Sequence, residues 1–411
     1  MALLGLIADG PCRAAGWLDS RDTRSSLAAV QALGAKASVE NGVLEIIPPG
    51  APPTGPVTLD CENSGTTARL LTGLLAGWLP ADGPEVVLVG DASLARRPMG
   101  RVVEPLRSMG ADITFLETDG RLPLRIRGAH LVGTDHQLSV PSAQVKSALL
   151  LAGLFARGRT TIAGAGGSRD HTEYFFDTLG IDCRDNSESP RLMVTGPVRC
   201  GAFDIKVPGD PSSAAFFQVA AALVPGSDVV VSGQSINYTR CGALRILRRA
   251  GARVSIERPN GKPGGEPCGD VRVAHNLLRG YVVGGPDIPA AIDEIPVLTV
   301  LATQCAGESL ISGAAELRVK ESDRLAVMAE NLQRLGADVV ELEDGLKITG
   351  PTPLVGGVSG RPVVLDTAGD HRVAMAMAIA ALVTKGETAL DEDTCVAVSY
   401  PYFFQSLEKL L

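Results

Sequence analysis

The stretch QRLGADVVELEDGLKITG, residues 333–350, carries the local pattern that decides the fold. It reads as the end of an amphipathic helix, a glycine, an alternating strand, a turn and a second strand. Gly336 stands where a helix commonly ends in the left-handed conformation, in which a side chain costs energy. Asp344-Gly345 is a dipeptide that favours the positive backbone angles of a tight hairpin. We therefore expect a helix, a glycine stop and two paired strands.

The same pattern occurs five times along the chain. Its helix-closing glycines are separated by 76, 70, 71 and 85 residues and are Gly34, Gly110, Gly180, Gly251 and Gly336. Asn41-Gly42 and Asp119-Gly120 continue two further copies into hairpins. A second apolar helix pattern lies between consecutive glycines, as in 66–79 and 142–156. Each unit is therefore expected to run strand, helix, strand, helix, strand, strand, and three units could close one domain.

The length of 411 residues suits two domains of roughly 200 residues each. The sequence predicts an α/β (α+β) protein with two pseudo-symmetric domains, residues 1–208 and 209–411, built from three βαβαββ repeats each. The boundary is expected within 207–211, Val-Pro-Gly-Asp-Pro. A sixth copy begins near Tyr402, and the sequence stops at Leu411 before any strand follows. That last repeat is therefore expected to stay open or to be completed by another segment.

Composition excludes several classes of protein. The net charge is −8 and aromatic residues are only 4%, which argues against nucleic acid as a partner. The longest apolar run has 11 residues, Val373 to Val383, too few to span a bilayer, so no membrane partner is expected. The eight cysteines are dispersed without a Cys-x-x-Cys pair, which favours free thiols in the cytoplasm.

Three helix starts could hold an anion with their free backbone N–H groups. They lie in 60–69 (DCENSGTTAR), 140–147 (VPSAQVKS) and 207–213 (VPGDPSS). A plain helix cap explains the same residues, and for Ser212 and Ser213 we keep the cap. Lys146, in the second stretch, is interpreted as a solvated or bridging residue.

Charged groups gather locally in spite of the acidic total. Basic residues crowd 96–101 (RRPMGR) and 318–324 (RVKESDR), while Asp293-Glu294 and Asp370-His371-Arg372 precede apolar helix patterns. Solvated helix faces explain such runs when they are taken singly. Together, several helix starts, cations and carboxylates favour transfer chemistry on phosphorylated substrates.

Eight stretches together resemble the enolpyruvyl transferase family, in the family's order and over nearly the whole chain. They are LDCENSGTTARLL, RRPMGRVVEPLRSMGAD, SAQVKSALLLAGL, SRDHTE, VPGDPSSAAFF, IDEIPVLTVLA, GAAELRVKESDR and DHRVAMAMA. The resemblance implies two inside-out α/β prisms of three repeats each, which agrees with the repeats counted above. It also implies a shikimate-pathway reaction of aromatic amino acid biosynthesis, with shikimate 3-phosphate and phosphoenolpyruvate as substrates.

In the implied reaction the 5-hydroxyl of shikimate 3-phosphate attacks C2 of phosphoenolpyruvate, C3 gains a proton, and phosphate then leaves. Neither a metal nor an organic cofactor is required. Asp293 and Glu321 match the positions of proton transfer, and Lys320 matches the residue that bridges both substrates. Carboxylates crowded by cations can serve as acid and base in turn.

The resemblance also implies two sets of binding residues. Those for phosphoenolpyruvate are Asn63, Gly65, Thr66, Arg97, Gln144, Arg324 and Arg372. Those for shikimate 3-phosphate are Ser142, Ala143, Gln144, Ser168, Arg169, Asp293 and Lys320. The Ser-Ala-Gln form together with Arg169 is similar to the family's second sequence class, and closure of the two domains on the substrates is expected.

The sequence departs from the family at its first residues. Members open with a strand and a Gly-Asp-Lys-Ser-x-Ser-x-Arg segment, which supplies a lysine, a serine and an arginine to the substrates, whereas MALLGLIADG matches the helix that follows it. We expect that the start codon was placed too far downstream; an in-frame stop codon within the corresponding upstream nucleotides would rule this out. If the chain begins at Met1, we expect weak or absent turnover, because an anion site without one charge partner loses several kcal/mol.

Alternative functions stay open at this point. One is an inactive or binding-only relative, and another is a transferase that acts on a different cyclic alcohol. A relative acting on UDP-N-acetylglucosamine would use a cysteine in a mobile loop, and no cysteine occurs between Cys61 and Cys183. We expect the enzyme to be a monomer.

Overall fold

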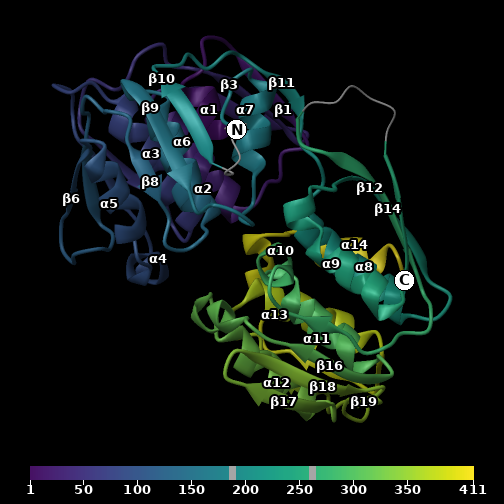
Figure 1. The fold of residues 1–411 in the computed structure, drawn as a ribbon. Helices are drawn as coiled ribbons and strands as arrows, with labels where there is room; N and C mark the ends of the chain where they lie inside the picture. The colour runs from purple at the N-terminus through teal and green to yellow at the C-terminus, as the bar shows by residue number, and fades with distance from the viewer. Residues whose placement is uncertain (185–190, 259–264) are drawn as a thin grey trace. The chain divides into compact units, whose positions relative to one another are not determined.

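The computed structural model describes residues 1–184, 191–258 and 265–411. Their contacts divide the chain into two compact units, Met1–Val207 and almost all of Pro208–Leu411, called unit 1 and unit 2 below. Each unit has its own cluster of buried apolar side chains. Helices and strands alternate in both units, which confirms the predicted α/β class (Figure 1).

Unit 1 contains seven helices and eleven strands among its described residues. In chain order they are α1 (Ala2–Leu6), β1 (Cys12–Ala15), α2 (Arg21–Ala32), β2 (Lys36–Glu40), β3 (Val43–Ile47), β4 (Val57–Asp60), α3 (Gly65–Trp78), β5 (Val86–Val89), α4 (Ala92–Arg96), α5 (Gly100–Ser108), β6 (Asp112–Phe115), β7 (Leu124–Arg127), β8 (Asp135–Gln137), α6 (Ala143–Gly153), β9 (Gly158–Ala163), α7 (His171–Thr178), β10 (Leu192–Gly196) and β11 (Asp204–Lys206). Its sheets have the strand orders β11-β1-β3-β2, β4-β5-β7-β6 and β10-β9-β8.

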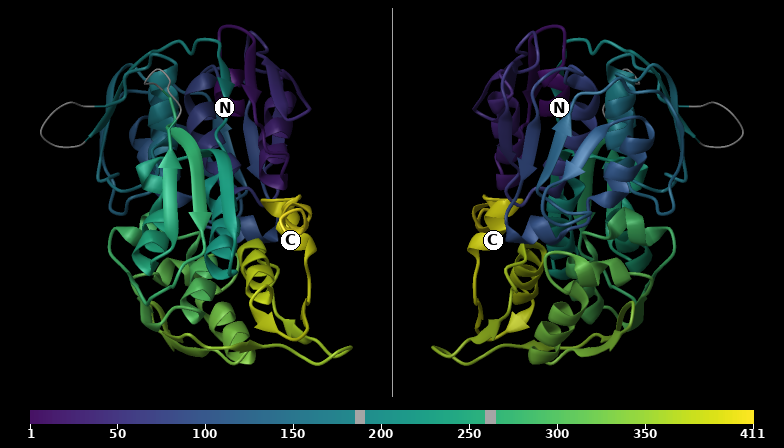
Figure 2. Two further views of the ribbon diagram at one scale, coloured as in Figure 1. Left: turned by 90° about the vertical axis from the view of Figure 1, so that its right-hand side faces the viewer. Right: turned by 90° about the vertical axis from the view of Figure 1, so that its left-hand side faces the viewer.

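Unit 2 repeats this alternation of helices and strands. In chain order its elements are α8 (Pro211–Leu223), β12 (Asp228–Ser235), η1 (Tyr238–Arg240), α9 (Gly242–Ala250), β13 (Arg253–Glu257), β14 (Cys268–Ala274), β15 (Val282–Val283), α10 (Asp287–Ala291), α11 (Ile295–Thr303), β16 (Gly307–Ile311), η2 (Ala315–Val319), α12 (Arg324–Arg334), β17 (Asp338–Leu342), β18 (Gly345–Gly350), β19 (Leu354–Val355), β20 (Val363–Leu365), α13 (His371–Ala381), β21 (Thr384–Lys385), β22 (Thr388–Leu390), η3 (Thr394–Val398) and α14 (Phe403–Glu408). Its sheets are β12-β14-β13 and β15-β16-β18-β17, with the pairs β19-β21 and β20-β22. The last helices, α13 and α14, are yellow in Figure 2.

The predicted βαβαββ unit is confirmed in both halves of the chain. β4 and β5 are parallel, and β7 and β6 complete their sheet in antiparallel pairs. β15 and β16 are likewise parallel, followed by antiparallel β18 and β17. All five helix-closing glycines have positive φ angles, from 70° to 99°. The glycine stop was therefore predicted for the right physical reason.

Two of the three hairpin predictions need correction. Asn41-Gly42 does join β2 to β3. Asp119-Gly120 instead lies within a longer connection, residues 116–123, between β6 and β7. Gly345 is not a turn residue, because it pairs with Leu342 as the first residue of β18. A side chain there would meet the backbone oxygen of Ile311 at 1.8 Å, so close strand packing requires this glycine.

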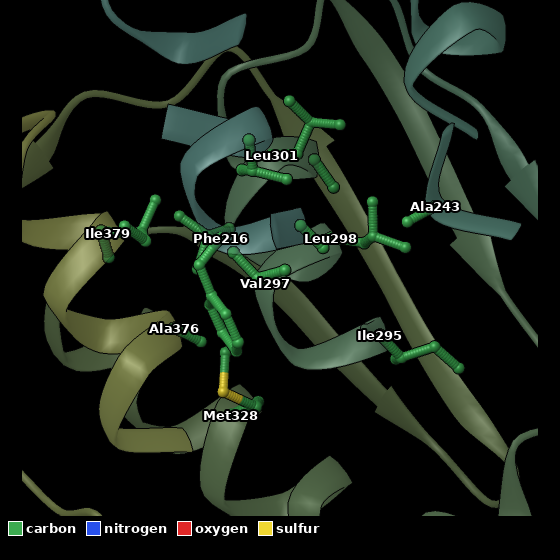
Figure 3. Close-up of a cluster of buried hydrophobic side chains, with 14 of the residues drawn as sticks. Phe216, Ala243, Ile295, Val297, Leu298, Leu301, Met328, Ala376 and Ile379 are labelled. Carbon is green, nitrogen blue, oxygen red and sulfur yellow. The ribbon is translucent and has the colours of Figure 1, made fainter. Parts of the chain in front are cut away.

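Helices form the buried interior of each unit. In unit 2, α8, α11 and α13 pack against one another, and every residue of α11 is buried, as expected for a helix that is apolar all round. Figure 3 shows Phe216 of α8 among side chains of α11 and α13, with Met328 of α12 below it. This packing fixes the starts of three helices relative to one another.

In unit 1 the close pair is α3 and α6. A β-carbon on Gly73 of α3 would lie 2.2 Å from the backbone oxygen of Ala148 on α6. Because the neighbouring atom is backbone, it cannot move aside cheaply. The pair holds two predicted anion-binding helix starts, at Gly65 and Ala143, on one rigid framework.

We predict that Gly73→Ala lowers the free energy of unfolding by about 1–3 kcal/mol, because overpacking forces the two helices apart. Urea unfolding followed by circular dichroism measures it. Gly201→Ala is the control, since its β-carbon meets no described atom within 4 Å. Equal stability of the two variants would show that α3 and α6 are not held by this contact.

Candidate active site

The start of α3 in unit 1 gathers most of the residues predicted to bind phosphoenolpyruvate. The Ser64 hydroxyl caps the helix by accepting from the Thr67 amide at 3.3 Å. The amides of Gly65 and Thr66 come before the first intrahelical bond and are the groups that can face an anion. The cap and the anion site are therefore compatible interpretations of the same helix start.

Arg69, a residue the sequence analysis did not single out, ties three segments of this region together. Its side chain is only 4% exposed. Its guanidinium donates to Gln144 Oε1 at 2.9 Å, to the Gly65 carbonyl at 3.3 Å and to the Pro98 carbonyl at 3.2 Å. The sequence did contain a signal for Arg69: it is an arginine one turn after Gly65, inside an otherwise apolar helix pattern.

The neighbouring predicted residues join the same network. Gln144 donates from Nε2 to the Thr66 hydroxyl at 2.8 Å, and Arg97 donates to Asn63 Oδ1 at 3.2 Å. Asn63, Gly65, Thr66, Arg97 and Gln144 are thus brought together. A β-carbon on Gly65 would lie 2.6 Å from Arg69 Nη1 and 3.4 Å from Arg97 Nη1, so any side chain there would crowd both cations.

Arg69 is a buried cation within this cluster. Among the described residues no carboxylate forms an ion pair with Arg69, whose contacts are carbonyl and amide oxygens. Burial, followed by the charges of Arg101 and Arg97, lowers the pKa of Arg69 to about 10. A buried cation whose contacts are all neutral oxygens favours the binding of an anion.

The residues predicted to bind shikimate 3-phosphate occupy two adjoining segments of unit 1. Ser142 caps α6 by accepting from the Val145 amide, and Ala143 and Gln144 follow it. Ser168 and Arg169 lie in the turn before α7, where the Ser168 hydroxyl donates to the Ala165 carbonyl at 2.7 Å. Lys146 is not solvated: it is 2% exposed and its ammonium lies 3.5 Å from the Ser168 carbonyl. The bridging interpretation of Lys146 is confirmed.

In unit 2, Arg324 brings the two predicted proton-transfer carboxylates together. Its guanidinium, 2% exposed, binds Glu321 at 2.7 Å and lies 3.6 Å from Asp293. Asp370 holds the same guanidinium through two hydrogen bonds, at 2.8 and 3.2 Å. Burial acts to lower the pKa of Arg324, but Asp370, Glu321 and Asp293 outweigh it and raise that pKa.

Two other predicted residues of unit 2 have different surroundings. Lys320 pairs with Glu316 at 3.0 Å, so among the described residues its ion pair is not with a proton-transfer carboxylate. Arg372 begins α13, and its backbone N–H donates to the capping Asp370. The charge of Arg372 also acts on Asp210 and His371, which places it near both.

Carboxylates stand at the starts of all three central helices of unit 2. Asp210, rather than Ser212 or Ser213, caps α8 and pairs with Arg240 at 3.0 Å, which corrects the serine caps. Ser212 instead donates to Glu294, the residue before α11. Asp370 caps α13. Unit 2 therefore presents proton-active groups at these helix starts, whereas Ser64 and Ser142 give α3 and α6 of unit 1 neutral caps.

Other possible sites receive less support. A recess of about 530 Å³ in unit 1 is lined by β1, β3 and residues 202–204, none of them predicted site residues. In the part of the chain that the structure describes, no three His, Cys, Asp or Glu side chains group as a metal site would require. The same residues include no helix long and apolar enough to cross a membrane.

Comparisons with known proteins agree with this picture. The family model for EPSP synthase (3-phosphoshikimate 1-carboxyvinyltransferase) matches residues 1–407. A 3-phosphoshikimate 1-carboxyvinyltransferase of Anaeromyxobacter sp. is 47% identical over 411 residues, covering 99% of this chain and 92% of its own length. One from Thermus thermophilus is also 47% identical, over 409 residues, with the same coverage. The solved EPSP synthase of Acinetobacter baumannii superposes with a TM-score of 0.87 at 37% identity and covers 100% of this chain and 92% of that one.

Fold and family match together define an enolpyruvyl transferase. The chain belongs to the EPSP synthase family, whose model matches it from residue 1 to residue 407. It is an enzyme of the shikimate pathway that transfers the enolpyruvyl group of phosphoenolpyruvate to shikimate 3-phosphate, with release of phosphate. The inactive relative and the different acceptor alcohol gain no support from these comparisons.

The buried imidazole of His371 gives a prediction about pH. Burial, followed by the charge of Arg372, lowers its pKa from 6.5 to about 4. At pH 7 both folded and unfolded states carry a neutral imidazole; as the pH falls below 6.5, only the unfolded state gains the proton. Its contribution to stability is therefore lost between pH 6.5 and 4, amounting to roughly 1–2 kcal/mol by pH 5.

Urea unfolding at pH 7 and pH 5 measures this loss in the parent chain and in His371→Gln. The variant should lose less of its free energy of unfolding over that interval, because the titrating group is gone. Equal pH dependence of the two proteins would show that the imidazole is not held neutral by its surroundings.

Proposed function

We propose that the two units supply different parts of the enolpyruvyl transfer. In unit 1, Asn63, Gly65, Thr66, Arg97 and Gln144 bind phosphoenolpyruvate, while Ser142, Ala143, Gln144, Ser168 and Arg169 bind shikimate 3-phosphate. In unit 2, Arg324 and Arg372 add to the first set, and Asp293 and Lys320 add to the second. The contacts of buried Arg69, all with carbonyl and amide oxygens, and the serine caps of α3 and α6 support this division.

Asp293 and Glu321 transfer the protons in this proposal, and Lys320 assists. One proton leaves the 5-hydroxyl as its oxygen attacks C2, and another is delivered to C3 and later removed when phosphate departs. The main support for these roles is that Arg324 contacts Glu321 and lies 3.6 Å from Asp293. A shared buried cation stabilises the carboxylate that remains after either side chain has given up its proton.

We also propose domain bounds of 1–208 and 209–411, and a monomer that works in the cytoplasm. The division of contacts after Val207 supports the bounds. Seven of the eight cysteines are buried as free thiols, which fits a reducing compartment.

Asp293→Asn and Glu321→Gln are each expected to slow phosphate release by at least about 100-fold, since general acid–base groups contribute factors of 10²–10⁴. For Glu321→Gln, which lies outside the proposed shikimate 3-phosphate set, the dissociation constant for that substrate should change much less. Phosphate release from both substrates and calorimetry of shikimate 3-phosphate binding measure the two effects against the parent chain.

Glu330→Gln is the matched control, because Glu330 lies on α12 in an exposed ion pair with Arg334. It should retain the parent rate. If either test variant also released phosphate at the parent rate, its carboxylate would not be a proton-transfer group.

A further inference from the structure

A fully buried ion pair lies beside the proposed shikimate 3-phosphate site. Lys146 on α6 and Glu173 on α7 have side chains only 2% and 4% exposed, and Nζ lies 2.5 Å from Oε1. The second carboxylate oxygen, Oε2, is buried without a hydrogen-bond partner among the described residues. The reaction as proposed above uses neither side chain.

Stability is a poor explanation for this pair. Removing two charges from water costs several kcal/mol for each ion, and an apolar pair of similar volume often leaves a protein equally stable or more so. Because only one oxygen of the Glu173 carboxylate is hydrogen-bonded, the contact offsets less of this desolvation cost. A better explanation for the presence of the ion pair is that it fixes the position of the segments it joins.

The pair joins the two segments proposed to bind shikimate 3-phosphate. Lys146 lies two residues after Gln144, on the helix that begins with Ala143. Its ammonium also lies 3.5 Å from the carbonyl of Ser168, in the turn 165–170 that carries Arg169. A neighbouring contact, between the hydroxyls of Ser147 and Thr172 at 2.6 Å, links the same helices without touching that turn.

We propose that Lys146, held by Glu173, is a positioning residue that fixes the Ser168–Arg169 turn relative to the start of α6 for binding of shikimate 3-phosphate. This inference rests on the proposed function of the turn. The Lys146 ammonium is a point charge with three donors, so it can hold a carboxylate and a carbonyl at once, which an apolar side chain cannot.

The double variant Lys146→Met with Glu173→Met replaces the ion pair by an apolar pair. It separates the positioning of the turn from the stability of the fold. The melting temperature should stay near that of the parent, while the dissociation constant for shikimate 3-phosphate rises about tenfold or more, a loss of at least about 1.4 kcal/mol. The Michaelis constant for phosphoenolpyruvate should not change. Calorimetry, thermal unfolding and steady-state kinetics measure the three quantities.

Two further double variants sharpen the result. Lys146→Arg with Glu173→Asp retains both charges and is expected to recover most of the affinity. Ser147→Ala with Thr172→Val removes the neighbouring contact and should leave the affinity close to the parent value. If the methionine pair does not fold, Lys146→Met with Glu173→Gln replaces it, because glutamine keeps the shape of glutamate.

Parent-like affinity in the folded neutral pair would overturn the inference, whatever its melting temperature. Loss of affinity in that pair without recovery in the charged pair would also overturn it. Arg169→Ala tests the underlying function of the turn. If Arg169→Ala weakens binding and the neutral pair does not, only the positioning role fails; if Arg169→Ala binds normally, the proposed function of the turn fails.

Discussion

Charge balance around buried guanidinium groups at helix starts is the constraint on which the rest of the structure depends. Arg324 is compensated several times over, by Asp370, Glu321 and the more distant Asp293. Arg69 receives only carbonyl and amide oxygens from the described residues. The fold is the same repeated unit in both cases, so the difference comes from which side chains surround each guanidinium. Serine caps at α3 and α6 add no negative charge near Arg69, whereas aspartate and glutamate at the helix starts of unit 2 are groups that can exchange protons.

This difference gives each unit a chemical character suited to one part of the reaction. In the proposed function a substrate phosphate or carboxylate supplies the negative charge that Arg69 lacks among the described residues, and binding would relieve the repulsion that Arg101 and Arg97 exert on it. In unit 2 the same guanidinium chemistry keeps carboxylates ionised: burial works against ionisation of Asp370, but Arg324 outweighs it and lowers the pKa. In the proposed function, anion binding and proton transfer both depend on an arginine that is buried in the first turns of a helix.

Local sequence signals predicted much of this arrangement, and tertiary contacts account for what they missed. The glycine stops and the βαβαββ order follow from backbone sterics and periodicity, and both are confirmed. Gly345 was assigned to a turn because its true constraint, the backbone of Ile311, belongs to a strand distant in sequence. Lys146 could be solvated or bridging until Glu173, on another helix, was known to face it. The roles of Asp293, Glu321 and Lys320 came from the family resemblance and stay predictions.

The most direct test of the central claim is a phosphorus NMR titration of shikimate 3-phosphate and of phosphoenolpyruvate with the purified protein. The account predicts saturable changes in both phosphorus resonances, and weaker binding as salt is added, because the attraction comes from the positive charge of the site's arginines. Phosphorus chemical shifts that stay at the values of the free substrates in the presence of excess folded protein would contradict it, because the arginines of unit 1 would then not bind these anions.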